Sequence, residues 1–150
     1  MIANRTTTID ADKTIGAIQR MLAAARASSL RIDYEDGQPC ALSFQLTSGG
    51  QLLAFRLPCN WQGTLRALRC DRGYPTRLKT PEQAKRVAWR VLRDWLRAQL
   101  SLVEAGASTI HEVFVPWLIT DDGTTVAARL FSGSSGLLAL PDRRGGEIAR

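Results

Sequence analysis

The sequence holds few of the residues on which catalysis, metal binding and disulfide formation depend. It has one histidine, His111, and three cysteines with no Cys-x-x-Cys pair among them. An odd number of separated cysteines favours reduced thiols, and one histidine gives little support for Cys–His zinc binding. Ser108 precedes His111 by three residues, but no acid is placed to orient the imidazole ring. We therefore expect no enzyme, no metal site and no cofactor.

Several longer signals are also missing. No run approaches the roughly 20 apolar residues of a membrane span, and residues 1–12 lack the apolar stretch of a signal peptide. Gly49 and Gly50 are not followed by the Gly-Lys-Ser/Thr of a phosphate-binding loop. Asp33 and Glu35 could hold Mg²⁺ on one strand face, but no lysine-bearing nuclease motif stands beside them. These absences favour a cytoplasmic protein without a membrane anchor and a solvent-facing role for the two carboxylates.

Positive charge is concentrated in one third of the chain. The net charge is +6, and residues 66–97 hold ten Lys or Arg against three Asp or Glu. This segment therefore carries +7, and the remainder of the chain carries −1. Such clustering indicates an anionic partner. The alternative is a solvated helix face with local pairs such as Glu82–Arg86 and Arg90–Asp94.

A long helix is predicted inside this basic segment. Thr80 can cap it, Pro81 suits its first turn, and the Gln83 side chain is placed to reach back to the cap. Gly106 supplies a left-handed stop. An apolar arc covers more than half of the circumference, so most of the helix is expected to be buried. The arc is centred on Ala84, Val87, Ala88, Val91, Trp95, Ala98 and Leu102. The remaining narrow ridge carries Arg86, Arg90, Arg93 and Arg97.

Alternating apolar and polar residues predict strands over residues 30–35, 42–46 and 53–57. Short turns at 36–37 and 48–50 join them, so the strands form an antiparallel meander with one wet face. We therefore predict an α+β fold, in which a three-stranded antiparallel meander packs against helices in the order α-β-β-β-α-α.

Further helices are expected on both sides of the meander. Asp10 or Asp12 can cap a first helix that runs to about Ala27, and a second helix spans residues 61–70. A short turn capped by Ser108 or Thr109 follows the long helix.

The domain boundaries follow from composition. Residues 1–9 are expected to be a flexible tail, residues 10–131 a single domain, and residues 132–150 a mobile, turn-rich tail. Within the domain, residues 117–119 and 126–131 read as a small hairpin around the turn at Asp122-Gly123.

The aromatic residues divide into two groups. Trp89 and Trp95 lie on the apolar arc of the long helix and are expected in the core. Trp61, Trp117 and Tyr74 are the better candidates for stacking on nucleic-acid bases.

Two resemblances can be read from the sequence. The order helix, meander, helix is similar to a double-stranded RNA-binding domain, and residues 83–88, QAKRVA, resemble the start of the last helix of that family. The likeness implies phosphate contacts by Lys85 and Arg86. The segment 60–79 has no counterpart in that family.

The second resemblance covers about residues 12–118. The chain is similar there to a family of small uncharacterised proteins from bacteriophages and prophages. This likeness implies a phage accessory protein in the host cytoplasm, without established catalytic residues. The residues that carry it are Tyr34, Asp36, Ser43, Phe44, FRLP at 55–58, residues 84–106 and EVFVP at 112–116.

Two functions remain open from the sequence. The first is a non-enzymatic accessory protein that binds DNA or RNA without reading base sequence. The second is a protein-binding factor that inhibits or modulates a host defence or replication complex. The apolar arc also leaves room for a homodimer. The residues predicted to bind nucleic acid are Arg72, Arg77, Lys85, Arg86, Arg90, Arg93 and Arg97.

Overall fold

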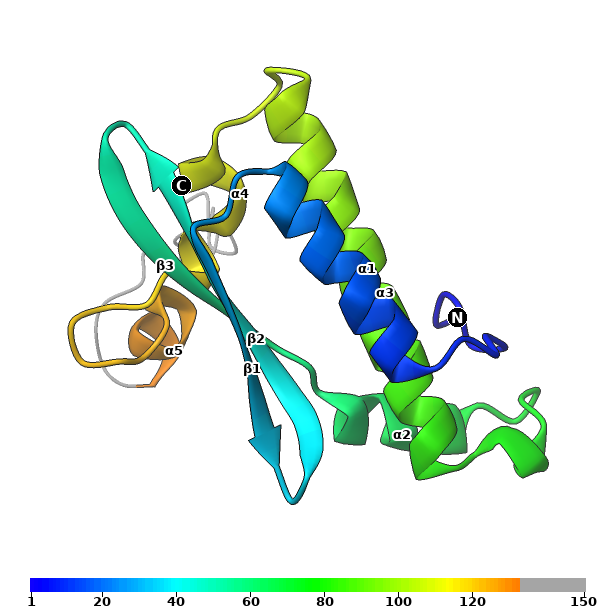
Figure 1. Ribbon diagram of the computed structural model, residues 1–150. Helices are drawn as coiled ribbons and strands as arrows, with labels where there is room; N and C mark the ends of the chain where they lie inside the picture. The colour runs from blue at the N-terminus through cyan, green and yellow to red at the C-terminus, as the bar shows by residue number, and fades with distance from the viewer. Residues whose placement is uncertain (133–150) are drawn as a thin grey trace, which may run out of the picture.

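The computed structural model describes residues 1–132 and confirms the α+β class, with three antiparallel strands and a long helix (Figure 1). One sheet has the strand order β1-β2-β3. In chain order the elements are α1 (Ala11–Ala24), β1 (Ser29–Glu35), β2 (Gln38–Ser48), β3 (Gln51–Pro58), α2 (Trp61–Cys70), the 3₁₀ turn η1 (Thr76–Leu78), α3 (Pro81–Glu104), α4 (Ile110–Phe114), the 3₁₀ turn η2 (Val115–Trp117) and α5 (Val126–Phe131).

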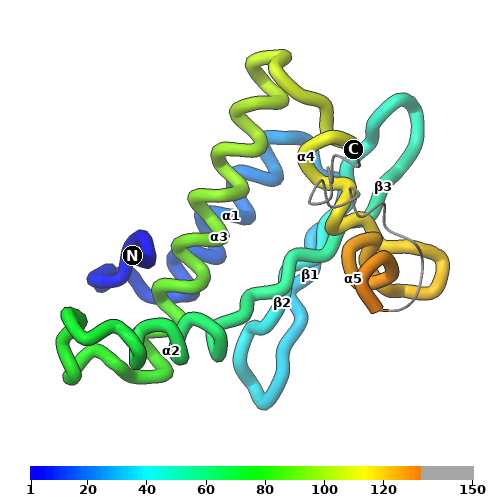
Figure 2. Tube along the Cα trace, turned by 180° about the vertical axis from the view of Figure 1, so that it is seen from behind, coloured from blue at the N-terminus to red at the C-terminus, as the bar shows by residue number. Residues whose placement is uncertain are grey.

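The register of the sheet places its apolar side chains on one face. Phe44 pairs with Leu30 of β1 and with Phe55 of β3, and Leu42 pairs in the same way with Ile32 and Leu57. Because side chains alternate along a strand, these residues share a face. Helices α1 and α3 lie side by side over that face in both views (Figures 1 and 2).

An aromatic cluster joins the sheet to the helices that follow it. The Phe114 ring lies 5.6 Å from Phe44 and 5.4 Å from Phe55, centroid to centroid, and Trp95 of α3 meets it edge-on at 5.9 Å. Edge-to-face and tilted contacts of this kind are favourable beyond the area that they bury. The cluster explains why α4, only five residues long, holds a fixed position.

Helix α3 changes its buried side along its length. In the first turns Ala84 and Val87 pack against α2, whereas further along Trp89 and Leu96 enter the main core. The predicted apolar stripe is therefore buried only near its start. Val91 and Leu102 are 38% and 43% exposed, so the stripe is open to solvent beyond the turns that pack against α2.

The capping prediction for α3 is correct for Thr80 and wrong for Gln83. The Gln83 amide nitrogen donates to the Thr80 hydroxyl at 3.2 Å, and Gly106 takes φ +70° after the helix. The Gln83 side chain turns away from the cap and donates to the carbonyl oxygens of Arg5 and Thr7 at 3.0 and 2.9 Å. A reciprocal capping box occurs instead at the start of α4.

The N-terminal segment is anchored, although a flexible tail is predicted over residues 1–9. Besides the two Gln83 bonds, the Tyr74 hydroxyl donates to the Arg5 carbonyl, and the Arg5 guanidinium lies 2.6 Å from the Asp71 carboxylate. The Asn4 amide donates to Asp94 at 2.7 Å. Residues 4–7 therefore join α3 to the loop after α2.

The predicted hairpin near the end of the domain is wrong. Residues 126–131 form the helix α5, because the Thr125 hydroxyl accepts from the Ala128 amide and starts a helix there. Isolated bridges join Leu118 to Phe55 and Ile119 to Thr125. Gly123 takes φ +78° and confirms the turn. The tail predicted over residues 132–150 lies, apart from Ser132, outside the described residues.

Substitution of Gln83 tests whether its side-chain hydrogen bonds stabilise the fold. It is 3% exposed, so Gln83→Leu nearly keeps its volume but leaves the Thr7 carbonyl without its donor and the Arg5 carbonyl with the Tyr74 hydroxyl alone. We expect the free energy of unfolding in urea to fall by about 1–3 kcal/mol. Gln19→Leu, on the exposed side of α1, is the matched control and should change it by less than about 0.5 kcal/mol. Equal effects of the two substitutions would contradict a structural role for Gln83.

Candidate functional site

The structure divides the predicted basic ridge of α3 into engaged and free arginines. Arg86 forms an ion pair with Asp10, with Nη2 and Nε at 2.9 and 3.1 Å from the carboxylate. Arg93 lies 3.0 Å from Asp94, and only 17% of its side chain is exposed. These two guanidinium groups are partly neutralised before any ligand arrives.

Lys85 is engaged as well. Its ammonium group lies 4.9 Å from the centre of the Trp61 ring and 3.2 Å from the side-chain oxygen of Gln38. A cation over an aromatic face is attracted by the negative face of the ring. The same contact covers a face of Trp61, so this tryptophan is a poor platform for stacking bases.

Arg90 and Arg97 remain available on α3. Neither has a carboxylate partner within residues 1–132; Arg97 is exposed and Arg90 is half-buried. They lie on one side of the helix, where Cα positions seven residues apart nearly coincide in direction. Two of the four arginines in the predicted ridge, Arg90 and Arg97, therefore remain without a carboxylate partner in the described residues.

A denser group of free arginines lies at α2 and the loop that follows it. Arg66, Arg69, Arg72 and Arg77 are all exposed, and no carboxylate within the described chain pairs with them. We call these four arginines the basic end. In both views α2 and its loop lie at one end of the molecule, beside the first turns of α3 (Figures 1 and 2).

Local structure explains why the basic end faces water. Asn60 caps α2 by accepting from the Gly63 amide at 2.8 Å, and Leu65 and Leu68 face inward. Positions 66 and 69 then fall on the outer side of the helix. Both arginines lie in the charged segment 66–97, but the predicted binding site does not include them. The helical spacing from Leu65 and Leu68 was the signal that could have found them.

The loop below the basic end is fixed by polar contacts. The Asp71 carboxylate pairs with Arg5 at 2.6 Å and accepts from the Gly73 amide at 2.9 Å. Lys79 donates from Nζ to the backbone carbonyls of Arg69 and Asp71 at 3.1 and 2.8 Å. A cation at the end of a helix also complements the helix dipole. Asp71, the one acid of this loop, is therefore already paired with Arg5. The loop that carries Arg72 and Arg77 is held by hydrogen bonds and an ion pair.

Tyr74 does not fit its predicted role in base stacking. It is 2% exposed, and its ring packs with Leu65, Leu68 and Val87 while its hydroxyl bonds the Arg5 carbonyl. A ring without an exposed face cannot stack on a base. Trp117, the third candidate, is half-buried and lines an apolar groove.

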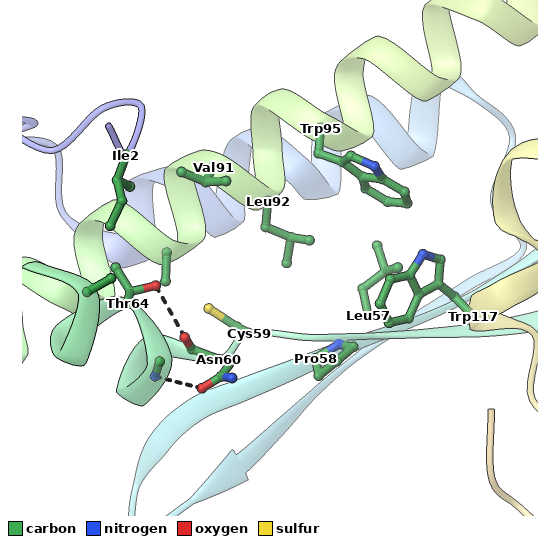
Figure 3. Close-up of a pocket in the computed structure, with 13 residues that line it drawn as sticks. Ile2, Leu57, Pro58, Cys59, Asn60, Thr64, Val91, Leu92, Trp95 and Trp117 are labelled. Carbon is green, nitrogen blue, oxygen red and sulfur yellow. Dashed lines mark hydrogen bonds between the residues drawn. The ribbon is translucent and has the colours of Figure 1, made fainter. Parts of the chain in front are cut away.

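This apolar groove lies between α2, the end of β3 and the middle of α3 (Figure 3). It is an open pocket of about 520 Å³. Trp95 and Trp117 form one end of it, with ring centroids 6.2 Å apart. The other lining residues are Ile2, Leu57, Pro58, Cys59, Asn60, Gly63, Thr64, Ala67, Ala88, Val91 and Leu92. A surface of this kind suits an apolar partner better than a phosphate.

The structure separates the polar groups that the sequence brings close to His111. The His111 Nδ1 lies 3.3 Å from the Ser48 hydroxyl rather than near Ser108, and both groups are near the surface. The neighbouring Glu112 accepts from the Thr109 amide, which lowers the pKa of this carboxyl and commits it to capping α4. In this part of the chain no helix could cross a membrane, and no cluster of three metal-binding side chains occurs.

Two other carboxylates are also committed to local structure. Asp33 lies between Arg31 at 2.8 Å and Arg56 at 3.2 Å, so it does not form the magnesium pair with Glu35 that the strand allowed. The hydroxyls of Thr120 and Thr124 donate to Asp122 and lower the pKa of its carboxyl.

Comparisons of the chain with protein-family models, with curated proteins and with solved structures found no match. The resemblances to phage proteins and to double-stranded RNA-binding domains therefore stay predictions.

The cysteines report on the packing around the groove. Burial, with a smaller effect of Cys40, raises the pKa of the Cys59 thiol from 9.0 to about 12, whereas Cys70 is exposed. At pH 8 Cys59 should therefore stay protonated and unreactive. We expect a thiol reagent to modify Cys70 rapidly in the folded protein and Cys59 only after unfolding, as read by mass spectrometry. Rapid modification of Cys59 under native conditions would contradict this packing.

Proposed function

We propose that this chain is a non-enzymatic nucleic-acid-binding accessory protein that holds the phosphate backbone of DNA or RNA through its basic end. The observation that carries the proposal is the exposure of Arg66, Arg69, Arg72 and Arg77 without carboxylate partners in the described chain. The predicted phage context is compatible with this role and belongs to the same proposal.

The chemistry of the cluster supports a phosphate ligand. Of the twenty basic residues in the sequence, seventeen are arginines. The planar guanidinium group presents a fork of N–H donors that matches phosphate in two parallel hydrogen bonds. Four such groups within residues 66–77 can neutralise several adjacent phosphates of one strand.

The support under the cluster favours binding without sequence preference. Lys79 and Asp71 are occupied in holding the loop, so the arginines lie on a surface whose polar groups are already paired. No exposed aromatic ring stands among them, because Tyr74 is buried and Trp61 lies under Lys85. Phosphate contacts without base contacts position a protein but do not select a sequence.

The second contribution comes from α3. Arg90 and Arg97 retain free charge and strengthen the attraction of an approaching polyanion. Arg86 contributes less, since binding a phosphate would compete with its ion pair to Asp10. This ranking of the arginines distinguishes the proposal from a general effect of the net charge.

The test compares two double charge reversals that lower the net charge equally. Arg72→Glu with Arg77→Glu removes half of the basic end, whereas Arg20→Glu with Arg26→Glu changes two exposed arginines, in and just after α1, that pair with no carboxylate in the described residues. We expect fluorescence anisotropy with single- and double-stranded DNA and RNA to show at least about tenfold weaker binding for the first variant, because phosphate contacts are lost. The control variant should lose clearly less.

The salt dependence supplies a second readout. The logarithm of the binding constant for duplex DNA falls with the logarithm of salt concentration by about 0.9 for each neutralised phosphate. The variant at positions 72 and 77 should therefore show a shallower slope by about 1 to 2. No binding to any of the four nucleic acids at low salt would refute the proposal and favour a protein partner. Equal losses in both variants would place the binding elsewhere.

A further inference from the structure

An apolar strip runs along the solvent side of α3 beyond the contact with α2. It consists of Val91, Trp95, Ala98 and Leu102, at spacings of four, three and four residues. Val91 and Leu102 are 38% and 43% exposed, Ala98 is exposed, and Trp95 is half-buried. The spacing is that of the seam along which two helices pack in a coiled coil. The strip extends about 16 Å along the helix axis, which is three turns.

The strip has a recessed half and an open half. Val91 and Trp95 line the apolar groove together with Trp117 (Figure 3). Ala98 and Leu102, nearer the end of α3, are not among its lining residues. On the wall that α2 contributes, the lining residues are Gly63, Thr64 and Ala67, whose small side chains leave room for another chain. The groove can thus receive the open half of a similar helix.

We propose that the strip is the contact between two copies of this chain, with their α3 helices antiparallel across a two-fold axis. In this arrangement Val91 of each copy faces Leu102 of the other, and Trp95 faces Ala98. Each layer then joins a larger side chain to a smaller one, which lets the seam fill without voids. The open half of each strip packs into the groove of the other copy, so both copies contribute the same surface to the contact.

The charges around the strip favour this occupant. On a helical projection the four arginines of α3 point about 110° or more away from the centre of the strip, so they stay outside the seam. The flanking residues are Asp94 and Ser101 on one side and Gln99 on the other. Antiparallel pairing places Asp94 beside Ser101 of the second copy rather than beside another carboxylate. Two chains of net charge +6 can therefore meet here without opposing like charges at the contact.

The proposal is independent of nucleic-acid binding, because the strip contains none of the arginines of the basic end. It is tested by sedimentation velocity of the wild-type chain over a range of concentrations, without nucleic acid. We expect a concentration-dependent monomer–dimer equilibrium. A wild-type chain that stays monomeric to about 200 μM would overturn the proposal, since even weak specific dimers reach micromolar to submillimolar affinity.

Charge substitutions locate the contact. Val91→Lys and Leu102→Glu each place an unpaired charge in the seam, and we expect each to raise the dimer dissociation constant by about 100-fold or more. Leu52→Glu, at an exposed apolar residue on β3, is the matched control and should leave it unchanged. Because all three side chains are already exposed, thermal unfolding should confirm that the variants fold. Folded seam variants that dimerise as the wild type does would overturn the proposal.

Mixing the two seam variants tests the direction of pairing. In the antiparallel arrangement Lys at 91 meets Glu at 102 of the other copy, so an equimolar mixture should form heterodimers although each variant alone is monomeric. A parallel pairing would place Lys against Val91 and would not be rescued. Failure of the mixture to dimerise, with both variants folded, would overturn the antiparallel contact.

Discussion

The burial of α3 on two different sides is the constraint on which the rest of the structure depends. Its apolar arc is too wide for one neighbour to cover, so α2 covers one side of the first turns, and α1 and the sheet cover another side of the helix. The neighbours of α3 are divided in the same way. Helix α2 packs against its first turns, and the sheet contributes Phe44 and Phe55 to the main core. The surface that this packing leaves exposed on α3 includes a free arginine, Arg97, and apolar side chains among polar residues.

Local patterns in the sequence were sufficient for most of the fold. The alternation of apolar and polar residues correctly predicted three antiparallel strands and which of their side chains face the core. Thr80 and Gly106 correctly predicted the two ends of the long helix. The errors occur where a short segment has two readings. Residues 126–131 suit a strand or a helix by composition, and the hydroxyl of Thr125 decides for the helix. No local pattern could show that Gln83 binds the carbonyls of Arg5 and Thr7.

The candidate site was less accessible to sequence reasoning, because charge can be counted along a chain but its pairing cannot. Asp10 lies 76 residues from Arg86, and Gln38 lies 47 residues from Lys85, so only the tertiary fold brings them together. The position of the charged segment was predictable, and the outer side of α2 could have been read from Leu65 and Leu68. Which guanidinium groups remain free depended on contacts that a single sequence does not encode locally.

The scarcity of lysine has a practical consequence. Of the three lysines, Lys79 is bonded to two backbone carbonyls and Lys85 lies over the Trp61 ring, which leaves Lys13, exposed on α1. Acetylation or an amine-reactive dye should therefore reach Lys13 and the terminal amine first and spare every arginine. Coupling through amines can accordingly fix the protein to a sensor surface with its guanidinium groups intact, whereas a dicarbonyl reagent that attacks guanidinium would remove them selectively.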